Sequence, residues 1–130
     1  MVEPELNLEK MKNIQIPTEE CLFCKIVLGE VPSEKVFEND DFLAFKDINP
    51  KSKGHTLIIP KKHIKDFLEL GSSLYKGYLE VAKKVAEKLV KENNAQGFNL
   101  VINNGLAAGQ IVFHLHMHII PRYANFPSKN

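Results

Sequence analysis

Residues 114–120 read HLHMHII, so histidine alternates with apolar residues over this stretch. Successive side chains of a β-strand point to opposite faces, and residues two apart share a face. The pattern therefore predicts a strand with one face in the hydrophobic core and the other toward something polar. The polar face carries His114, His116 and His118. Because three of the chain's five histidines fall within five positions, chance alternation on a surface strand is a weak explanation.

The remaining hydrophobic periodicity predicts an α+β fold with an antiparallel sheet and one long helix. The long helix is predicted at 72–94, where apolar residues recur at steps of three and four, with Ser72 or Ser73 as its cap. A short helix within 22–30 is expected to end at Gly29. Five segments are predicted strands: 35–39, 42–47, 55–60, 98–103 and 111–121.

Length and composition limit the kinds of protein that this chain can be. With 130 residues and no linker or repeat, it is expected to hold one domain at 18–130 after a variable N-terminal arm at 1–17. A formal net charge of +1 argues against a nucleic-acid-binding or membrane-binding surface. No apolar run reaches the ~20 residues of a membrane helix, and acidic residues replace a signal-peptide core. We therefore expect a cytoplasmic protein.

Two chemical interpretations of the histidine row compete. On a strand that rises ~3.3 Å per residue, the outer pair lies about 13 Å apart, whereas a Zn–N bond is only about 2.0–2.1 Å. All three histidines can therefore hardly share one metal ion. The alternative is chemistry on an anion, because imidazole can act as nucleophile, proton donor or phosphate partner at neutral pH. Gly105 and Gly109, just upstream, permit a tight turn whose N–H groups can bind phosphate oxygens.

Cys21 and Cys24 are the only cysteines, and they are separated by two residues. In a reducing compartment such a pair indicates metal binding or redox chemistry more than a structural disulfide. A thioredoxin-like redox motif would follow a buried strand, and no strand is predicted before Cys21. Half of a zinc site remains the competing interpretation.

Taken together, these segments resemble the histidine triad (HIT) family, whose signature is His-x-His-x-His followed by apolar residues. The resemblance extends from Cys21 to Tyr123 and includes HTLIIPKKHI and NNGLAAGQIVFHLHMHIIPR. CLFC and HIIPR are most similar to the small Hint-like or bacterial-type Hit branch. The resemblance implies a HIT fold, with a five-stranded antiparallel sheet, one long helix and short helices, assembled as a two-fold homodimer. It also implies purine nucleoside phosphate ligands such as AMP derivatives.

The same resemblance assigns catalytic roles. His116 would attack the α-phosphorus of a nucleoside phosphoramidate or dinucleoside polyphosphate, giving a nucleotidyl-histidine that water resolves. The carbonyl of His114 would fix the tautomer of His116, and His118 would contact the phosphate. Gln110 would orient phosphate or water, and the Gly109 region would donate N–H groups. The protein would then be a nucleotide hydrolase or transferase.

Further family positions concern the nucleoside. Asp47 corresponds to a carboxylate that binds ribose hydroxyls, although an Asp at a strand end is also a common turn former. Ile48 and Phe45 suit a base pocket or the core equally well, and Asn103 matches an asparagine near the phosphate. Ile111 departs from the family pattern, because many relatives have a hydroxyl residue there. This departure leaves room for a nucleotide-binding adaptor with little turnover.

Relatives that contain the cysteine pair bind structural zinc with it. The resemblance implies four ligands: Cys21, Cys24, His63 and His114. The alternative is a site without metal, in which two buried thiols lie beside hydrogen-bonded His63 and His114. A third functional class, a structural zinc module, predicts no purine nucleotide binding.

Overall fold

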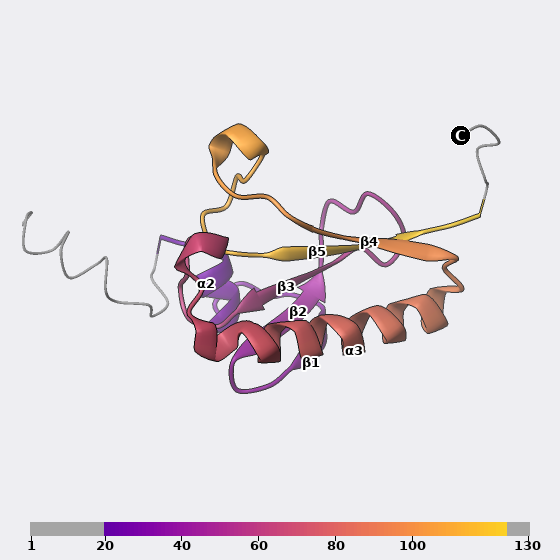
Figure 1. Ribbon diagram of the computed structural model, residues 1–130, viewed down its shortest axis with the longest axis horizontal. Coiled ribbons are helices and arrows are strands. Elements are labelled where there is room, and N and C mark those ends of the chain that lie inside the picture. Colours follow the sequence, from indigo (N-terminus) through magenta and orange to yellow (C-terminus); the bar gives the residue numbers. More distant parts are fainter. Residues whose placement is uncertain (1–19, 125–130) are drawn as a thin grey trace, which may run out of the picture.

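The computed structural model describes residues 20–124, which form a five-stranded sheet with a long helix on one face (Figure 1). The predicted arm at 1–17, and residues 18–19 and 125–130 of the predicted domain, lie outside the described residues. The helices are α2 (Leu22–Val27) and α3 (Tyr75–Asn93), and 3-10 turns lie at Phe67–Glu69, Ser72–Leu74 and Leu106–Ala108. The strands are β1 (Lys35–Glu38), β2 (Phe42–Lys46), β3 (Thr56–Pro60), β4 (Gly97–Ile102) and β5 (Met117–Arg122).

All neighbouring strands are antiparallel, in the order β1-β2-β3-β5-β4. The first hairpin turns at Asn39, whose Oδ1 accepts hydrogen bonds from the N–H groups of Asp41 at 3.0 Å and Phe42 at 2.8 Å. Such local bonding is the reason that asparagine favours turns. The predicted antiparallel sheet with one long helix, and the hairpin at its start, are therefore confirmed.

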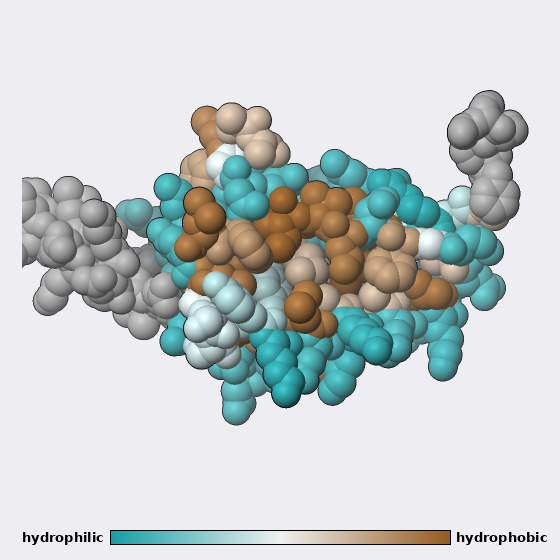
Figure 2. All heavy atoms as spheres, in the orientation of Figure 1, coloured by the Kyte–Doolittle hydropathy of each residue, from teal (hydrophilic) through white to brown (hydrophobic). Residues whose placement is uncertain are grey.

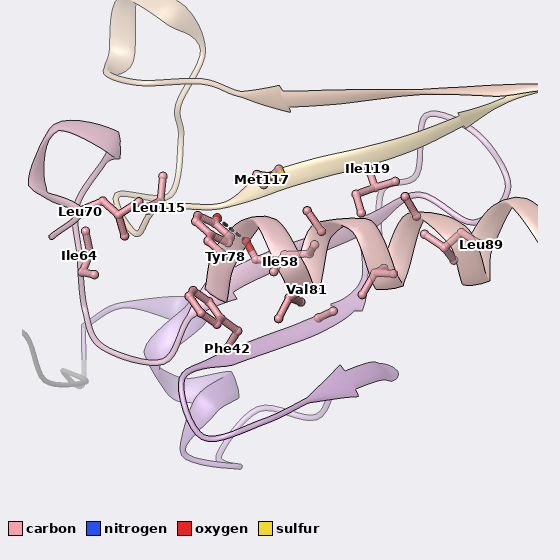
Figure 3. Close-up of a cluster of buried hydrophobic side chains, with 14 residues drawn as sticks. Phe42, Ile58, Ile64, Leu70, Tyr78, Val81, Leu89, Leu115, Met117 and Ile119 are labelled. Atoms are coloured by element: carbon pink, nitrogen blue, oxygen red, sulfur yellow. Dashed lines mark hydrogen bonds between the residues drawn. The ribbon is translucent and has the colours of Figure 1, made fainter. Parts of the chain in front are cut away.

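The main core lies between α3 and one face of the sheet (Figure 3). Tyr78 of α3 stacks on Phe42 with ring centroids 5.0 Å apart, and its hydroxyl donates to the carbonyl of Ile58 at 2.7 Å. The apolar residues that alternate with the three histidines also pack in this core, as the alternation predicts. The buried stripe of the helix comprises Tyr78, Val81, Ala82, Val85, Ala86 and Leu89.

The opposite face of the sheet is covered by α2. Phe23 and Ile26 of this helix pack against a second buried cluster. Because side chains alternate along a strand, Leu43 and Phe45 of β2 join this cluster, whereas their neighbours face α3. The sheet is thus covered on both sides, which explains why β2 and β3 read as nearly continuous apolar runs.

The predicted strand at 111–121 is wrong at its start. β5 begins only at Met117, which is the first residue paired on both sides, with Ile58 of β3 and Ile102 of β4. Residues 111–116 lie outside the sheet, because β4 ends at Ile102, opposite Met117, and the pairing with β3 stops at Ile58. Pro121 lies within β5 instead of ending it, because the pairing with β3 extends only to Ile119.

Both helices are shorter than their predicted segments. Ser72 and Ser73 do not cap α3, because they belong to a 3-10 turn and the helix begins at Tyr75 without a side-chain cap. At its other end Asn94 adopts a left-handed conformation with φ 57°, and Gly29 does the same after α2 with φ 82°. Neither described helix combines the length and apolar character that crossing a bilayer requires.

Candidate functional site

The three histidines of the alternating stretch lie in two different environments. His114 is fully buried and its ring faces the two cysteines. His116, which is 7% exposed, and the half-buried His118 stay together with ring centroids 5.0 Å apart. Only His118 lies within β5, because the strand starts at Met117. His114 and His116 both pack against Phe23 of α2, on the side opposite Leu115, as the alternation predicts, but the ring of His114 is turned to the cysteines and away from the other two histidines.

His116 offers one ring nitrogen as a lone pair. Its Nδ1 lies 2.7 Å from the carbonyl oxygen of His114, and a carbonyl can only accept, so Nδ1 carries the hydrogen and Nε2 does not. Burial lowers the pKa of His116, although the hydrogen bond to His114 opposes this shift. Phe23 packs against the imidazole in a T-shaped arrangement with centroids 5.0 Å apart. A neutral imidazole with this tautomer is a nucleophile at neutral pH.

His118 is held by His55, a residue to which the sequence analysis assigned no role. Nε2 of His55 lies 2.9 Å from Nδ1 of His118, and Nδ1 of His55 accepts the main-chain N–H of Lys51 at 3.0 Å. Burial lowers the pKa of both histidines, and the charges of His116 and His55 help lower that of His118 to about 4. The register between β3 and β5 is the signal that could have indicated this contact. Leu57 lies opposite His118, and His55 comes two residues before Leu57.

Asp47 completes this hydrogen-bonded group. Its Oδ2 lies 3.5 Å from Nε2 of His55, and its Oδ1 accepts the N–H of Asn49 at 2.9 Å. The contact is not an ion pair, because His55 is neutral at pH 7. Asp47, His55 and His118 place possible ligand atoms within 4.8 Å of one another. Nε2 of His55 nevertheless carries a hydrogen, because the N–H of Lys51 points at Nδ1, and this disfavours a metal ion here.

Cys21, Cys24, His63 and His114 form a separate cluster whose sulfur and nitrogen atoms all lie within 4.8 Å of one another. The separations are 3.3 Å from Cys21 Sγ to His114 Nδ1, 3.2 Å from Cys24 Sγ to His63 Nδ1, and 3.5 Å from Cys24 Sγ to His114 Nδ1. Tetrahedral zinc, with bonds of about 2.3 Å to sulfur and about 2.0 Å to nitrogen, sets S···N separations of about 3.5 Å. The four residues therefore fit a zinc ion.

The hydrogen bonds of this cluster favour the metal-binding protonation states. Nε2 of His114 lies 2.8 Å from the carbonyl of Pro60, so Nε2 carries the hydrogen and the Nδ1 lone pair faces the sulfurs. Burial raises the pKa of the Cys21 thiol, and the hydrogen bond that the N–H of Cys24 donates to its sulfur at 3.3 Å opposes this shift. Thiolate and neutral imidazole are the forms that zinc binds.

Gln110 is fully buried and binds three main-chain groups. Its Oε1 accepts the N–H of Gly105 at 2.7 Å, and its Nε2 donates to the carbonyls of Lys65 at 2.8 Å and Val112 at 3.1 Å. The N–H groups of Gly109 and Gln110 donate to carbonyls within the same loop. This geometry does not support the expectation that Gln110 and the Gly109 amide bind phosphate, because these groups hold the loop together.

The residues predicted to bind the nucleoside differ in exposure. Phe45 is a core residue whose ring packs 5.5 Å from that of Phe23. Ile48 is 87% exposed and Ile111 is 80% exposed, while Asn103 is partly buried just after β4. Of the apolar residues predicted to bind the nucleoside, Phe45 is therefore buried and Ile48 presents a large exposed surface.

Comparison with known proteins identifies the family. Residues 28–125 match the HIT domain. The adenosine 5'-monophosphoramidase hnt1 of Schizosaccharomyces pombe is 45% identical over 102 residues, which cover 78% of this chain and 74% of that protein. The adenylylsulfatase HINT3 of Arabidopsis thaliana is 45% identical over 103 residues, which cover 79% of this chain and 52% of that protein.

The fold has equally close counterparts. The crystal structure of a HIT family member from Bacillus subtilis has a TM-score of 0.80 and 50% identity, and the match covers 82% of this chain and 76% of that one. The sheet with its long helix thus has a precedent among solved structures. The chain belongs to the HIT domain family.

Proposed function

We propose that this protein is a nucleotide hydrolase or transferase that acts through a nucleotidyl intermediate on His116. The observation that carries the proposal is the 2.7 Å contact between His116 Nδ1 and the carbonyl of His114, which leaves Nε2 as the attacking atom. The names of the two curated relatives, an adenosine monophosphoramidase and an adenylylsulfatase, support adenosine 5'-phosphate derivatives as the substrate class.

In the first step the lone pair of His116 Nε2 attacks the α-phosphorus of the substrate. A P–N bond forms, the bond to the leaving group breaks, and the leaving group departs with a proton from solvent, while Nε2–H of His118 donates a hydrogen bond to a phosphate oxygen. The imidazole of His116 becomes cationic, and its Nδ1–H bond to the His114 carbonyl strengthens as that charge develops. This stronger hydrogen bond lowers the energy of the intermediate relative to an imidazole without a carbonyl partner.

In the second step water attacks the same phosphorus atom. The water proton passes to solvent, the P–N bond breaks, and its electron pair returns to Nε2 of His116. The products are a nucleoside monophosphate and the original neutral histidine pair. Burial lowers the pKa of His116 and of His118. Both rings are therefore neutral at pH 7 before substrate binds.

Nucleoside binding is proposed for the end of β2 and the loop that follows. The carboxylate of Asp47 would accept hydrogen bonds from ribose hydroxyls. Ile48 would cover the base beside Phe45, and Asn103 would lie at the phosphate. Because Gln110 and the Gly109 amide are occupied within their own loop, their proposed phosphate contacts would require the loop to rearrange.

Zinc is proposed as a structural ion held by Cys21, Cys24, His63 and His114. Its chemistry would be to cross-link α2, the segment after β3 and the segment before β5, which adds stability that an unfolded chain lacks. His114 has a double role in this arrangement. Its ring faces the metal cluster and its carbonyl fixes the tautomer of His116.

A two-fold homodimer is proposed through β4 and α3. β4 is an edge strand with unpaired main-chain groups on one side. Figure 2 shows apolar side chains gathered over this region of the molecule. A groove here is lined by Lys83, Glu87 and the apolar residues Leu79, Ala82, Ala86, Val90, Phe98 and Leu100. A second copy of the chain would pair the edges and cover the groove.

A nucleotide-binding adaptor is the alternative function. Ile111 favours it, because its side chain is 80% exposed beside the catalytic segment and cannot donate a proton to a leaving group. The adaptor predicts tight binding of AMP derivatives with negligible turnover.

The test is a substrate panel of adenosine phosphoramidate, adenylyl sulfate and diadenosine polyphosphates. The wild type is expected to release AMP, and His116→Ala is expected to lose turnover while still binding AMP. Lys91→Ala is the control, because it truncates an exposed side chain of α3 and leaves every proposed site residue in place. AMP release that survives in His116→Ala contradicts the proposed nucleophile, and binding without turnover in the wild type favours the adaptor.

A further inference from the structure

We propose that the loop between β2 and β3, residues 47–54, sets the tautomer of His55 and through it the direction in which His118 donates a hydrogen bond to the phosphate. The catalytic meaning of this device rests on the proposed function, although the tautomers themselves do not. The residues that act are Lys51, through its main-chain N–H, and Ser52 and Tyr123, which hold the loop in place. None of them contacts the reacting atoms, so they are positioning residues.

The loop is fastened to the end of β5 at two points. Ser52 Oγ donates to the carbonyl of Pro121 at 2.6 Å, and the Tyr123 hydroxyl donates to the carbonyl of Lys53 at 2.6 Å. Gly54 lies against the same strand with φ +92°, and a Cβ there would meet the Asn93 side chain at 2.9 Å. The main chain at this point therefore has little freedom to move away from the sheet.

This fastening places the N–H of Lys51 against His55. The loop turns back on itself, since the N–H of His55 donates to the carbonyl of Ser52 at 3.1 Å. Within that turn the N–H of Lys51 lies 3.0 Å from Nδ1 of His55. An amide N–H can only donate, so Nδ1 must be the unprotonated nitrogen and the hydrogen of the neutral ring must be on Nε2. The opposite tautomer would point two N–H groups at each other.

The tautomer of His55 determines the tautomer of His118. Nε2–H of His55 is 2.9 Å from Nδ1 of His118 and 3.5 Å from Oδ2 of Asp47. The shorter contact assigns the hydrogen bond to His118, whose Nδ1 must then accept. The hydrogen of His118 is thereby on Nε2, the nitrogen that the proposed reaction needs as a donor. A main-chain amide thus fixes the direction of the hydrogen bonds that pass through the two histidines to the phosphate.

The direct test is long-range ¹H–¹⁵N NMR of the unliganded wild type, which distinguishes protonated from unprotonated ring nitrogens. The expected result is an Nε2–H tautomer for both His55 and His118 and an Nδ1–H tautomer for His116. A spectrum with hydrogen on Nδ1 of His55 overturns the inference. If the wild type hydrolyses no nucleotide, the proposed function fails, yet this spectrum still decides the role of the loop.

Two substitutions at one position separate the N–H from the side chain. Lys51→Pro removes the main-chain N–H, and Lys51→Ala keeps it while removing the exposed side chain. Lys51→Pro is expected to give mixed tautomers of His55 and a kcat lower by roughly tenfold or more, the scale for losing an orienting partner of a functional histidine, with a smaller change in KM. Lys51→Ala is expected to retain the wild-type tautomers. Equal tautomer populations in the two variants overturn the inference.

A milder variant covers the case in which Lys51→Pro does not fold. Tyr123→Phe removes only the hydroxyl that holds Lys53, so the loop loosens while the Lys51 N–H remains. The minor His55 tautomer is expected to become detectable, with a partial loss in kcat. Unchanged tautomers with unchanged kcat would show that the fastening does not control His55.

Discussion

Replacing Gln110 by leucine tests whether this side chain holds its loop together or contacts phosphate. The side chain is fully buried and forms three hydrogen bonds, to the Gly105 N–H and to the carbonyls of Lys65 and Val112. Each neutral hydrogen bond is worth about 1 kcal/mol net, and each buried partner left unsatisfied adds to the loss. Partial hydration of the loosened loop reduces the total. Gln110→Leu is therefore expected to lower the free energy of unfolding by about 2–4 kcal/mol.

Urea denaturation followed by circular dichroism measures this change. At about 4 °C per kcal/mol for a chain of this size, the melting temperature should fall by about 8–16 °C. Gln96→Leu is the matched control, because Gln96 forms one exposed hydrogen bond, to the N–H of Ala124, and its loss should change stability by less than about 0.5 kcal/mol. A Gln110→Leu protein with wild-type stability and a large loss of kcat would refute the loop-holding role and restore a role on phosphate.

Three other predictions concern the metal cluster, His118 and the proposed dimer interface. The purified protein should contain about one zinc ion per chain, and Cys24→Ser should lower both metal content and melting temperature; wild-type stability after complete chelation would contradict the structural role. The pKa of His118 is about 4 in the folded chain and about 6.5 in the unfolded chain. Between pH 4 and pH 6.5, His118 therefore binds fewer protons in the folded chain than in the unfolded chain. Stability should therefore decrease as pH falls from 6.5 to 4, less steeply in His118→Gln, and identical slopes would contradict the assignment. Leu100→Asp should convert a dimer to a monomer in analytical ultracentrifugation, and an unchanged dimer would place the interface elsewhere.

The sequence pattern predicted the fold best where one physical rule dominates. Alternation alone placed Leu115, Met117 and Ile119 in the core, and steps of three and four identified the buried stripe of α3. The start of β5 could not be predicted in this way, because it depends on where the partner strands end. Ile102 is the last residue of β4, and the ladder with β3 begins at Ile58.

The site shows the same limit. Residue type indicated phosphate chemistry at the histidine row, and the family resemblance assigned the nucleophile to His116, but His55 gave no signal of its own. Its position beside His118 follows from the register that pairs Leu57 with His118, and register is a property of two distant segments. Gln110 was assigned to phosphate on the family pattern, whereas its partners at Lys65 and Val112 are visible only in the fold.

The central claim is that Nε2 of His116 becomes covalently bonded to phosphorus. Rapid quenching of the wild type with α-³²P-labelled adenosine phosphoramidate, followed by peptide mapping under alkaline conditions that preserve P–N bonds, tests it most directly. The account predicts label on the peptide that contains His116, formed and lost at rates that match turnover. Turnover without any labelled histidine, or label on His114 or His118 instead, would contradict it.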